Sequence, residues 1–145
     1  MIDHDKKFIF IHIPKTGGVS IEKALEWEEE RHHTLEFYNK EHSICDYYKF
    51  TIVRNPWDLL VSWHVYHKKY NKIRAELREF NEWVLADMPT HWNNKKIDGR
   101  QWGDPLDYKQ WINRYSDYDY IAKTETLQKD FDIICDQINI TRRVL

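Results

Sequence analysis

The chain has 145 residues, of which 41% are hydrophobic and 15% aromatic, enough for one domain with its own core. The formal net charge of −2 excludes the general basic field that is expected of a nucleic-acid-binding protein. No apolar run approaches the length of a membrane span and no signal-peptide apolar region is present, so we expect a cytoplasmic protein without membrane contacts. Cys45 and Cys135 lie far apart in the sequence and predict two reduced thiols, which fits that compartment; a disulfide between them is the alternative.

The first motif is a glycine-containing turn between an apolar segment and a predicted helix. Residues 8–13 are apolar and rich in isoleucine, which predicts a buried strand, and residues 19–30 follow as a helix. Gly17 and Gly18 allow a tight turn that presents backbone N–H groups, and Lys15 adds a positive charge. Together these features favour a site for a phosphate-like group. The turn is not a Walker loop, because Lys15 precedes both glycines; the alternative is an ordinary turn with a solvated lysine.

A second motif follows the next predicted strand, residues 49–53. Asn55 is a good helix N-cap and Pro56 fits the first helical position, so we expect a helix to begin here. Arg54 would then lie at the carboxyl end of a strand, where open α/β folds bind their ligands, and its guanidinium suits a bidentate phosphate contact. Ser62, two helical turns further on, can add a hydroxyl group. The alternative is a surface arginine and an unrelated helical serine.

Together the two motifs resemble those of the sulfotransferases that use 3′-phosphoadenosine 5′-phosphosulfate (PAPS), in particular the branch of carbohydrate O-sulfotransferases and small bacterial and phage relatives. Residues 13–20 look like the family's loop for the 5′-phosphosulfate. Residues 53–58, with Ser62, look like its 3′-phosphate motif. Residues 120–127 are a weaker likeness to a strand-to-helix segment late in that fold. The resemblance covers most of the chain and is thin over residues 71–119.

The resemblance implies a role for each matching residue. Lys15 would contact the phosphosulfate and stabilise charge on the departing phosphate. Arg54 and Ser62 would hold the 3′-phosphate, which distinguishes this donor from ATP. No metal is needed, because the leaving group is already a good one. Backbone N–H groups and hydroxyls would cradle the 5′ end of the donor, and these belong to Thr16, Gly17, Gly18, Val19 and Ser20.

Transfer of a sulfuryl group to a hydroxyl also needs a base, and two adjacent histidines lie between the motifs. In related sequences a histidine in this interval, often followed by threonine, is the candidate base, so we predict His33, with His32 as the second choice. A pair of solvated loop histidines is the alternative. His12, in the first strand, is interpreted as a core histidine. His64 and His67 lie three residues apart without a recognisable third ligand, so we predict no metal site.

Two features depart from the family pattern. Leu59 stands where family members often carry an arginine after Trp-Asp. We interpret it as a packing variation that also removes one positive charge. The chain ends at Leu145, whereas the family usually continues with further donor contacts. We therefore expect residues 1–145 to form a single domain that is either minimal or shortened at its C-terminus.

The remaining pattern alternates strands with helices, which predicts an α/β fold: a small parallel sheet flanked by helices, with a P-loop-like nucleotide site. The second motif should open a helix over residues 56–70. We expect a third strand at residues 119–123 and a final amphipathic helix over 127–138, with room for a fourth strand in the middle of the chain. Residues 73–84 show helical spacing. Turn residues make residues 88–107 a long loop, which either covers the site or is a mobile surface loop.

The sequence thus predicts an enzyme that moves a sulfuryl group from PAPS to a hydroxylated acceptor, such as a glycan or another small molecule, without a metal. An amine acceptor is a further option. Two alternatives stay open: a nucleotide-dependent kinase that uses ATP and magnesium, and a non-catalytic nucleotide-binding protein of the same fold. The resemblance favours a soluble protein of bacterial or viral type over the membrane-anchored Golgi relatives. The oligomeric state does not follow from the sequence.

Overall fold

Four strands form one mixed sheet in the part of the chain that the structure describes. The computed structural model describes residues 1–27, 32–70, 79–86 and 115–145. Strands two to four run parallel, whereas the first is antiparallel to the second. The α/β class, the parallel arrangement of three strands and the third predicted strand are confirmed. In spatial order the strands are β1 (Ile2–Asp3), β2 (Phe8–Ile11), β3 (Tyr48–Val53) and β4 (Tyr120–Lys123).

The additional strand, β1, lies at the edge of the sheet near the N-terminus, not in the middle of the chain where the sequence left room for it. The chain folds back from β1 to β2, and Lys7 adopts a left-handed conformation in the connection, with φ 54°. A strand of two residues is too short to show the alternation by which strands are recognised in a sequence. The sheet is therefore parallel only from β2 to β4.

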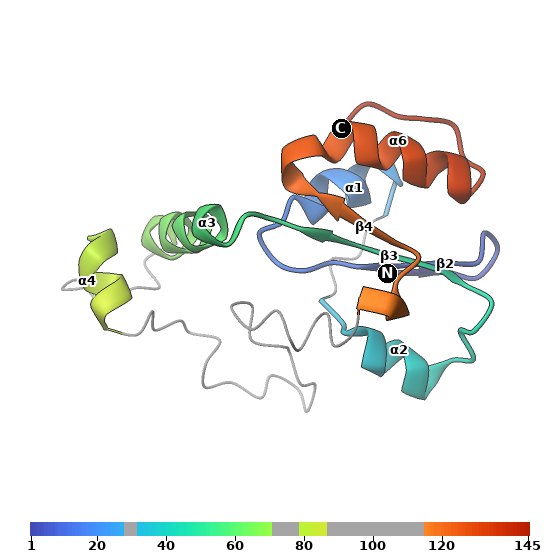
Figure 1. The fold of residues 1–145 in the computed structure, drawn as a ribbon, viewed down its shortest axis with the longest axis horizontal. Coiled ribbons are helices and arrows are strands. Elements are labelled where there is room, and N and C mark those ends of the chain that lie inside the picture. The colour runs from blue at the N-terminus through green and yellow to red at the C-terminus, as the bar shows by residue number, and fades with distance from the viewer. Residues whose placement is uncertain (28–31, 71–78, 87–114) are drawn as a thin grey trace.

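Different helices cover the two faces of the sheet (Figure 1). Phe8 and Phe10 of β2 belong to the core beneath α1 and α6, whereas Ile9 and Ile11 belong to the core beneath α2. This alternation is what a strand that is buried on both faces requires. The helices of these two layers are α1 (Gly18–Ala24), α2 (Leu35–Glu41) and α6 (Leu127–Gln137).

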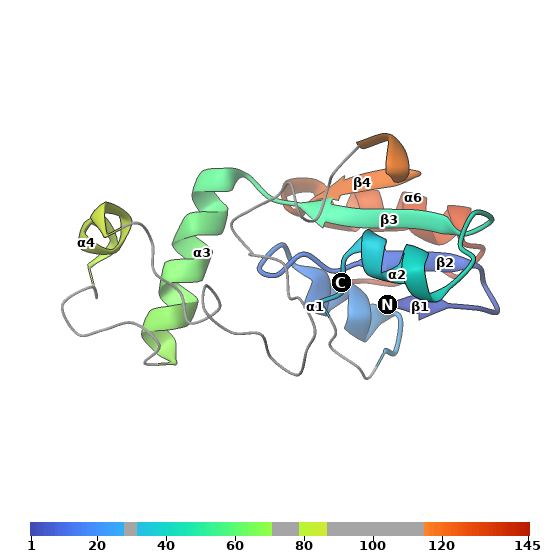
Figure 2. The ribbon, with the colours of Figure 1, turned by 90° about the horizontal axis from the view of Figure 1, so that it is seen from below.

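Helix α3 (Pro56–Lys69) leaves the carboxyl end of β3 and, with α4 (Phe80–Leu85), lies beyond that end of the sheet (Figure 1 and Figure 2). The side chain of Asn55 accepts a hydrogen bond from the backbone N–H of Trp57 at 3.0 Å, and Pro56 opens the helix. The predicted N-cap and the predicted extent of this helix are confirmed.

Leu59, interpreted from the sequence as a packing variation, is a core residue. Its side chain is 2% exposed and packs with Trp63 and Trp83 in a small core between α3 and α4. An unpaired guanidinium in this place would be desolvated among aromatic rings, at a substantial cost in stability. Leu59 thus belongs to the contact between these two helices.

Two predicted elements end earlier than the sequence indicated. The helix expected over residues 19–30 ends at Ala24, because the chain turns at Glu26, whose φ of 57° a continuous helix does not allow. The strand expected over residues 8–13 ends at Ile11. The final helix agrees with its predicted extent to within one residue.

The middle of the chain is only partly described. Of the helical pattern predicted over residues 73–84, α4 contains the last part, and residues 71–78 lie outside the described residues. The long loop predicted at residues 88–107 lies outside them entirely.

Three features bear on the wider predictions. No helix in the described segments is long and apolar enough to cross a membrane. Cys45 is exposed and Cys135 is buried, and both are free thiols. His64 and His67 are buried in α3, and within the described ranges no group of three His, Cys, Asp or Glu side chains is placed to hold a metal ion.

Candidate active site

A cavity of about 500 Å³ lies where the loop after β2 faces α3, and its size is within the usual range for small-molecule sites. The two sequence motifs, about 40 residues apart in the chain, both contribute to its wall. The predicted donor-binding residues that line it are Lys15, Gly17, Gly18, Val19, Arg54 and Ser62.

Lys15 is held in an unusual conformation at this wall. Its φ is 68°, in the left-handed region, which is strained for a residue with a Cβ and costs on the order of 1–3 kcal/mol. Its ammonium lies over the ring of Tyr66, 4.5 Å from the ring centroid. Burial lowers the pKa of Lys15, and the nearby charges of Arg54 and Lys69 lower it further. The site thus gathers positive charges that a bound anion would stabilise.

The backbone of the loop is tied to the ends of the neighbouring strands. Arg54 Nη1 donates a hydrogen bond to the carbonyl of Lys15 at 3.3 Å. The hydroxyl of Thr124, directly after β4, lies 2.7 Å from the carbonyl oxygen of Thr16 and 3.1 Å from that of Val53. The loop is therefore held by the residues that directly follow β3 and β4.

Two residues expected to contact the donor are placed differently. The hydroxyl of Thr16 is buried and donates to the carbonyl of Ile13 at 2.7 Å, so this side chain shapes the loop from within. Ser20 is exposed on α1, and neither residue is part of the cavity wall described above. The cavity wall thus does not include these two hydroxyls, and their contacts with a donor stay predictions.

His32 lines the same cavity as Lys15 and Arg54. Its Nδ1 lies 3.0 Å from the carbonyl oxygen of His12. Because a carbonyl only accepts, Nδ1 carries the hydrogen, and the lone pair of the neutral ring is on Nε2. Burial, with the nearby His12, lowers the pKa of His32 to about 4, so the ring is neutral at pH 7. This is the state in which an imidazole can accept a proton.

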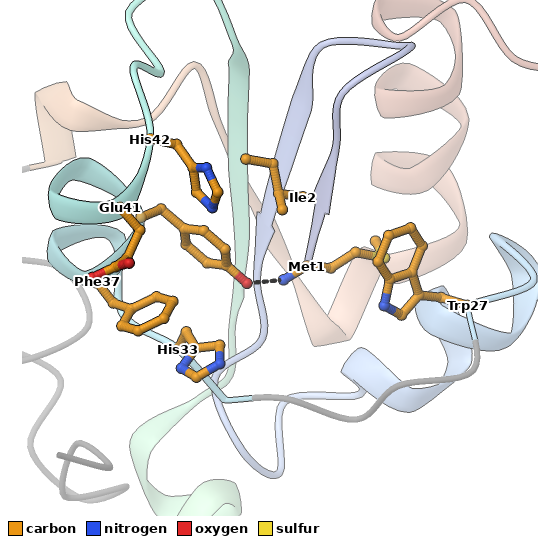
Figure 3. Close-up of a pocket in the computed structure, with 8 residues that line it drawn as sticks. Met1, Ile2, Trp27, His33, Phe37, Glu41 and His42 are labelled. Atoms are coloured by element: carbon orange, nitrogen blue, oxygen red, sulfur yellow. Dashed lines mark hydrogen bonds between the residues drawn. The ribbon is translucent and has the colours of Figure 1, made fainter. Parts of the chain in front are cut away.

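His33 lies in a different environment. It lines a separate cavity of about 220 Å³, and its ring stacks on Phe37 with 4.0 Å between centroids. Figure 3 shows this cavity beside Met1, whose N-terminal amine donates to the Tyr38 hydroxyl at 2.6 Å. The structure thus separates the two candidate bases. It brings His32, the second choice from the sequence, to the cavity of Lys15 and Arg54, and this placement favours His32 over His33.

His12 is a core residue, as interpreted from the sequence. Its side chain is 3% exposed, and its Nδ1 lies 2.7 Å from Oε1 of Glu22. The ring also stacks on Phe10 in the layer beneath α1. His12 is therefore a buried, hydrogen-bonded histidine directly behind the loop.

The cavity also contains residues that the sequence reasoning missed. Tyr66 and Tyr70 line its α3 side, with 4.8 Å between their ring centroids. They follow Ser62 at intervals of four residues, so all three share one face of the helix. That spacing was readable in the sequence once Ser62 had been assigned to the site.

The lowered pKa of His32 predicts a pH dependence of stability. Between about pH 4 and pH 6.5 the unfolded chain protonates this ring while the folded protein does not, so the free energy of unfolding falls as the pH falls through this window. Urea unfolding of wild type and His32→Gln at pH 7 and pH 5 measures the effect. The wild type should lose more stability than the variant. His42→Gln, at an exposed histidine, is the control, and equal losses in wild type and His32→Gln would contradict a buried neutral His32.

A scan against protein-family models matches residues 1–145 to the model described as "Sulfotransferase family". A search of curated proteins found no match to the chain. The family match extends over the full length, including the loop of Lys15 and the segment of Arg54 that the fold brings to one cavity. With its α/β sheet flanked by helices, the chain belongs to the sulfotransferase family.

Proposed function

We propose that the protein transfers the sulfuryl group of PAPS to a hydroxyl group of an acceptor, without a metal. The observation that carries the proposal is the single cavity that joins Lys15, Arg54 and His32. Sulfotransferases generally use PAPS, which is anionic at both its 5′-phosphosulfate and its 3′-phosphate. A site with cations from two separate motifs suits a donor with two anionic ends.

The fit to PAPS rests on the charges of this cavity. Burial lowers the pKa of Lys15, and the charges of Arg54 in the wall and of Lys69 nearby lower it further. Like charges thus lie close together here. An anion beside Lys15 would reverse this unfavourable interaction. Arg54, at the end of β3, and Ser62, on the facing helix, would hold the 3′-phosphate, and Lys15 with the backbone of Gly17 and Gly18 would hold the 5′ end.

The chain's own residues divide the chemistry between them. The donor supplies a sulfuryl group on a phosphate that is a good leaving group. His32 would accept the proton of the acceptor hydroxyl at Nε2, since Nδ1–H is engaged by the carbonyl of His12. Lys15 would face the negative charge that develops on the departing phosphate. An anionic donor beside the ring would also raise the pKa of His32 from about 4 toward neutrality, where an imidazole is most effective as a base.

The acceptor that we propose is a glycan or another small hydroxylated molecule. Tyr66 and Tyr70 present two rings at the α3 wall of the cavity, and Tyr70 is 52% exposed. Flat aromatic faces of this kind can stack on a sugar ring or on the adenine of the donor.

A thermal-shift titration with 3′-phosphoadenosine 5′-phosphate (PAP), without metal, tests the donor site. At a concentration about 100 times its dissociation constant, PAP should stabilise the protein by about 2.7 kcal/mol. Adenosine 5′-phosphate should stabilise it far less, because it lacks the 3′-phosphate that Arg54 would contact. ATP with magnesium represents the kinase alternative. Equal stabilisation by all three nucleotides would contradict the proposed donor, and PAP binding without any transfer from PAPS would support the non-catalytic alternative.

A further inference from the structure

Glu22 and His12 form a buried polar pair directly behind the loop. Glu22 belongs to α1, and His12 follows β2. Their side chains are 4% and 3% exposed, and Nδ1–H of His12 donates to Oε1 of Glu22 at 2.7 Å. The other carboxylate oxygen, Oε2, is buried and has no hydrogen-bond partner in the described structure. Well-packed apolar side chains in place of both partners are often as stable or more so, and stability alone therefore does not account for a pair of this kind.

The His12 ring fills the space behind Gly18. A Cβ built on Gly18 would lie 2.2 Å from Cδ2 of His12 and 2.4 Å from Nε2, so no other residue fits while the ring stays in place. Gly18 lines the cavity together with Lys15. The orientation of the His12 ring therefore limits how closely the backbone of the loop can approach β2.

The same residue also holds His32. The carbonyl of His12 accepts the hydrogen bond from His32 Nδ1, and the two rings meet edge to face with 4.4 Å between centroids and 68° between planes. The His12 ring, held by Glu22, thus lies against both Gly18 and His32, the candidate base.

We propose that Glu22 is a positioning residue: by fixing the His12 imidazole, it sets the place of Gly18, where the loop of Lys15 meets α1, and of His32 at the cavity wall together. The inference rests on the proposed function, since it concerns the geometry between the donor and the base. It accounts for a carboxylate that is kept in the core although one of its oxygens has no partner in the described residues. Glu22 itself does not line the cavity.

Three substitutions at Glu22 separate this role from a purely structural one. Glu22→Gln keeps an oxygen that can accept from His12. Glu22→Met keeps the length of the side chain and removes the acceptor, and Glu22→Asp keeps the carboxyl group but draws it back by one methylene. Ile134→Val, fully buried in α6 and not part of the cavity wall, is the control for a general loss of packing.

The two readouts are the dissociation constant for PAP, from calorimetry, and the ¹⁵N and ¹H signals of the His32 imidazole, assigned with a His32→Gln variant. Glu22→Met and Glu22→Asp should raise the dissociation constant by about 10-fold and shift the His32 signals, as expected when a supporting contact is lost. Glu22→Gln should stay within about 3-fold of wild type, because the contact with His12 is kept. Ile134→Val should lower the unfolding temperature and leave both readouts unchanged.

The inference is overturned if Glu22→Met is less stable than wild type but keeps the wild-type PAP affinity and His32 signals. If Glu22→Met does not fold, Glu22→Asp decides by the same criterion. Failure of wild type to bind PAP would instead count against the proposed function. In that case the His32 signals of the Glu22 variants still decide whether Glu22 positions this ring.

Discussion

Replacement of Lys15 by alanine is expected to lower sulfuryl transfer from PAPS by about 10²- to 10³-fold, the scale seen when a charge-stabilising group is removed from a reacting centre. PAP binding should weaken as well, because the variant lacks the cation beside the 5′ end. Alanine meets the same restriction on the left-handed backbone as lysine does, so the loop is not relaxed by the change. The rate is measured as transfer of a radiolabelled sulfuryl group from PAPS to a mixture of hydroxylated acceptors. Calorimetry with PAP measures the affinity.

The control for this variant is Lys129→Ala, which removes an equal charge from an exposed position on α6. Its transfer rate and PAP affinity should equal those of the wild type. A wild-type transfer rate in Lys15→Ala would contradict the role assigned to Lys15. A similar loss of rate in both variants would show that the net charge of the protein matters, and not the local contact.

Substitution of the two adjacent histidines should have unequal effects. His32→Ala is expected to lower kcat by about 100-fold or more, with PAP affinity little changed, because a general base acts on the acceptor proton and not on the donor. His33→Ala should retain near wild-type turnover, since its ring stacks on Phe37 beside a different cavity. Rates at saturating PAPS check this comparison. A large loss in His33→Ala with wild-type turnover in His32→Ala would restore the choice made from the sequence.

The parts of the site that could be predicted lie next to recognisable strands and helix caps. Lys15 and Arg54 each follow closely on a buried strand, and parallel strands bring their carboxyl ends to one edge. The N-cap at Asn55 fixed the start of α3 and with it the helix face of Ser62. Local signals were sufficient here because chain topology alone converts them into proximity.

The choice between His32 and His33 could not be made in this way. Adjacent side chains in an irregular segment point in different directions, and which of them meets the cavity depends on how the chain returns from α1 to α2. His32 is directed by the carbonyl of His12, a contact across 20 residues that no pattern in the sequence signals. The end of α1 also could not be predicted from a local signal. The left-handed conformation there is adopted by Glu26, and no glycine marks it in the sequence.

The hydrogen bonds to the carbonyls of Lys15 and Thr16 have a consequence for how a ligand would bind. Arg54 and Thr124 hold the loop in its shape through contacts that are complete within the protein. The entropic cost of ordering this loop is therefore met during folding. The binding of a nucleotide does not have to offset that cost again. If the loop were flexible, part of the binding free energy would be needed to order it. Here that part is available for discrimination between nucleotides, so the selectivity of the cavity depends in part on the folded sheet beneath it.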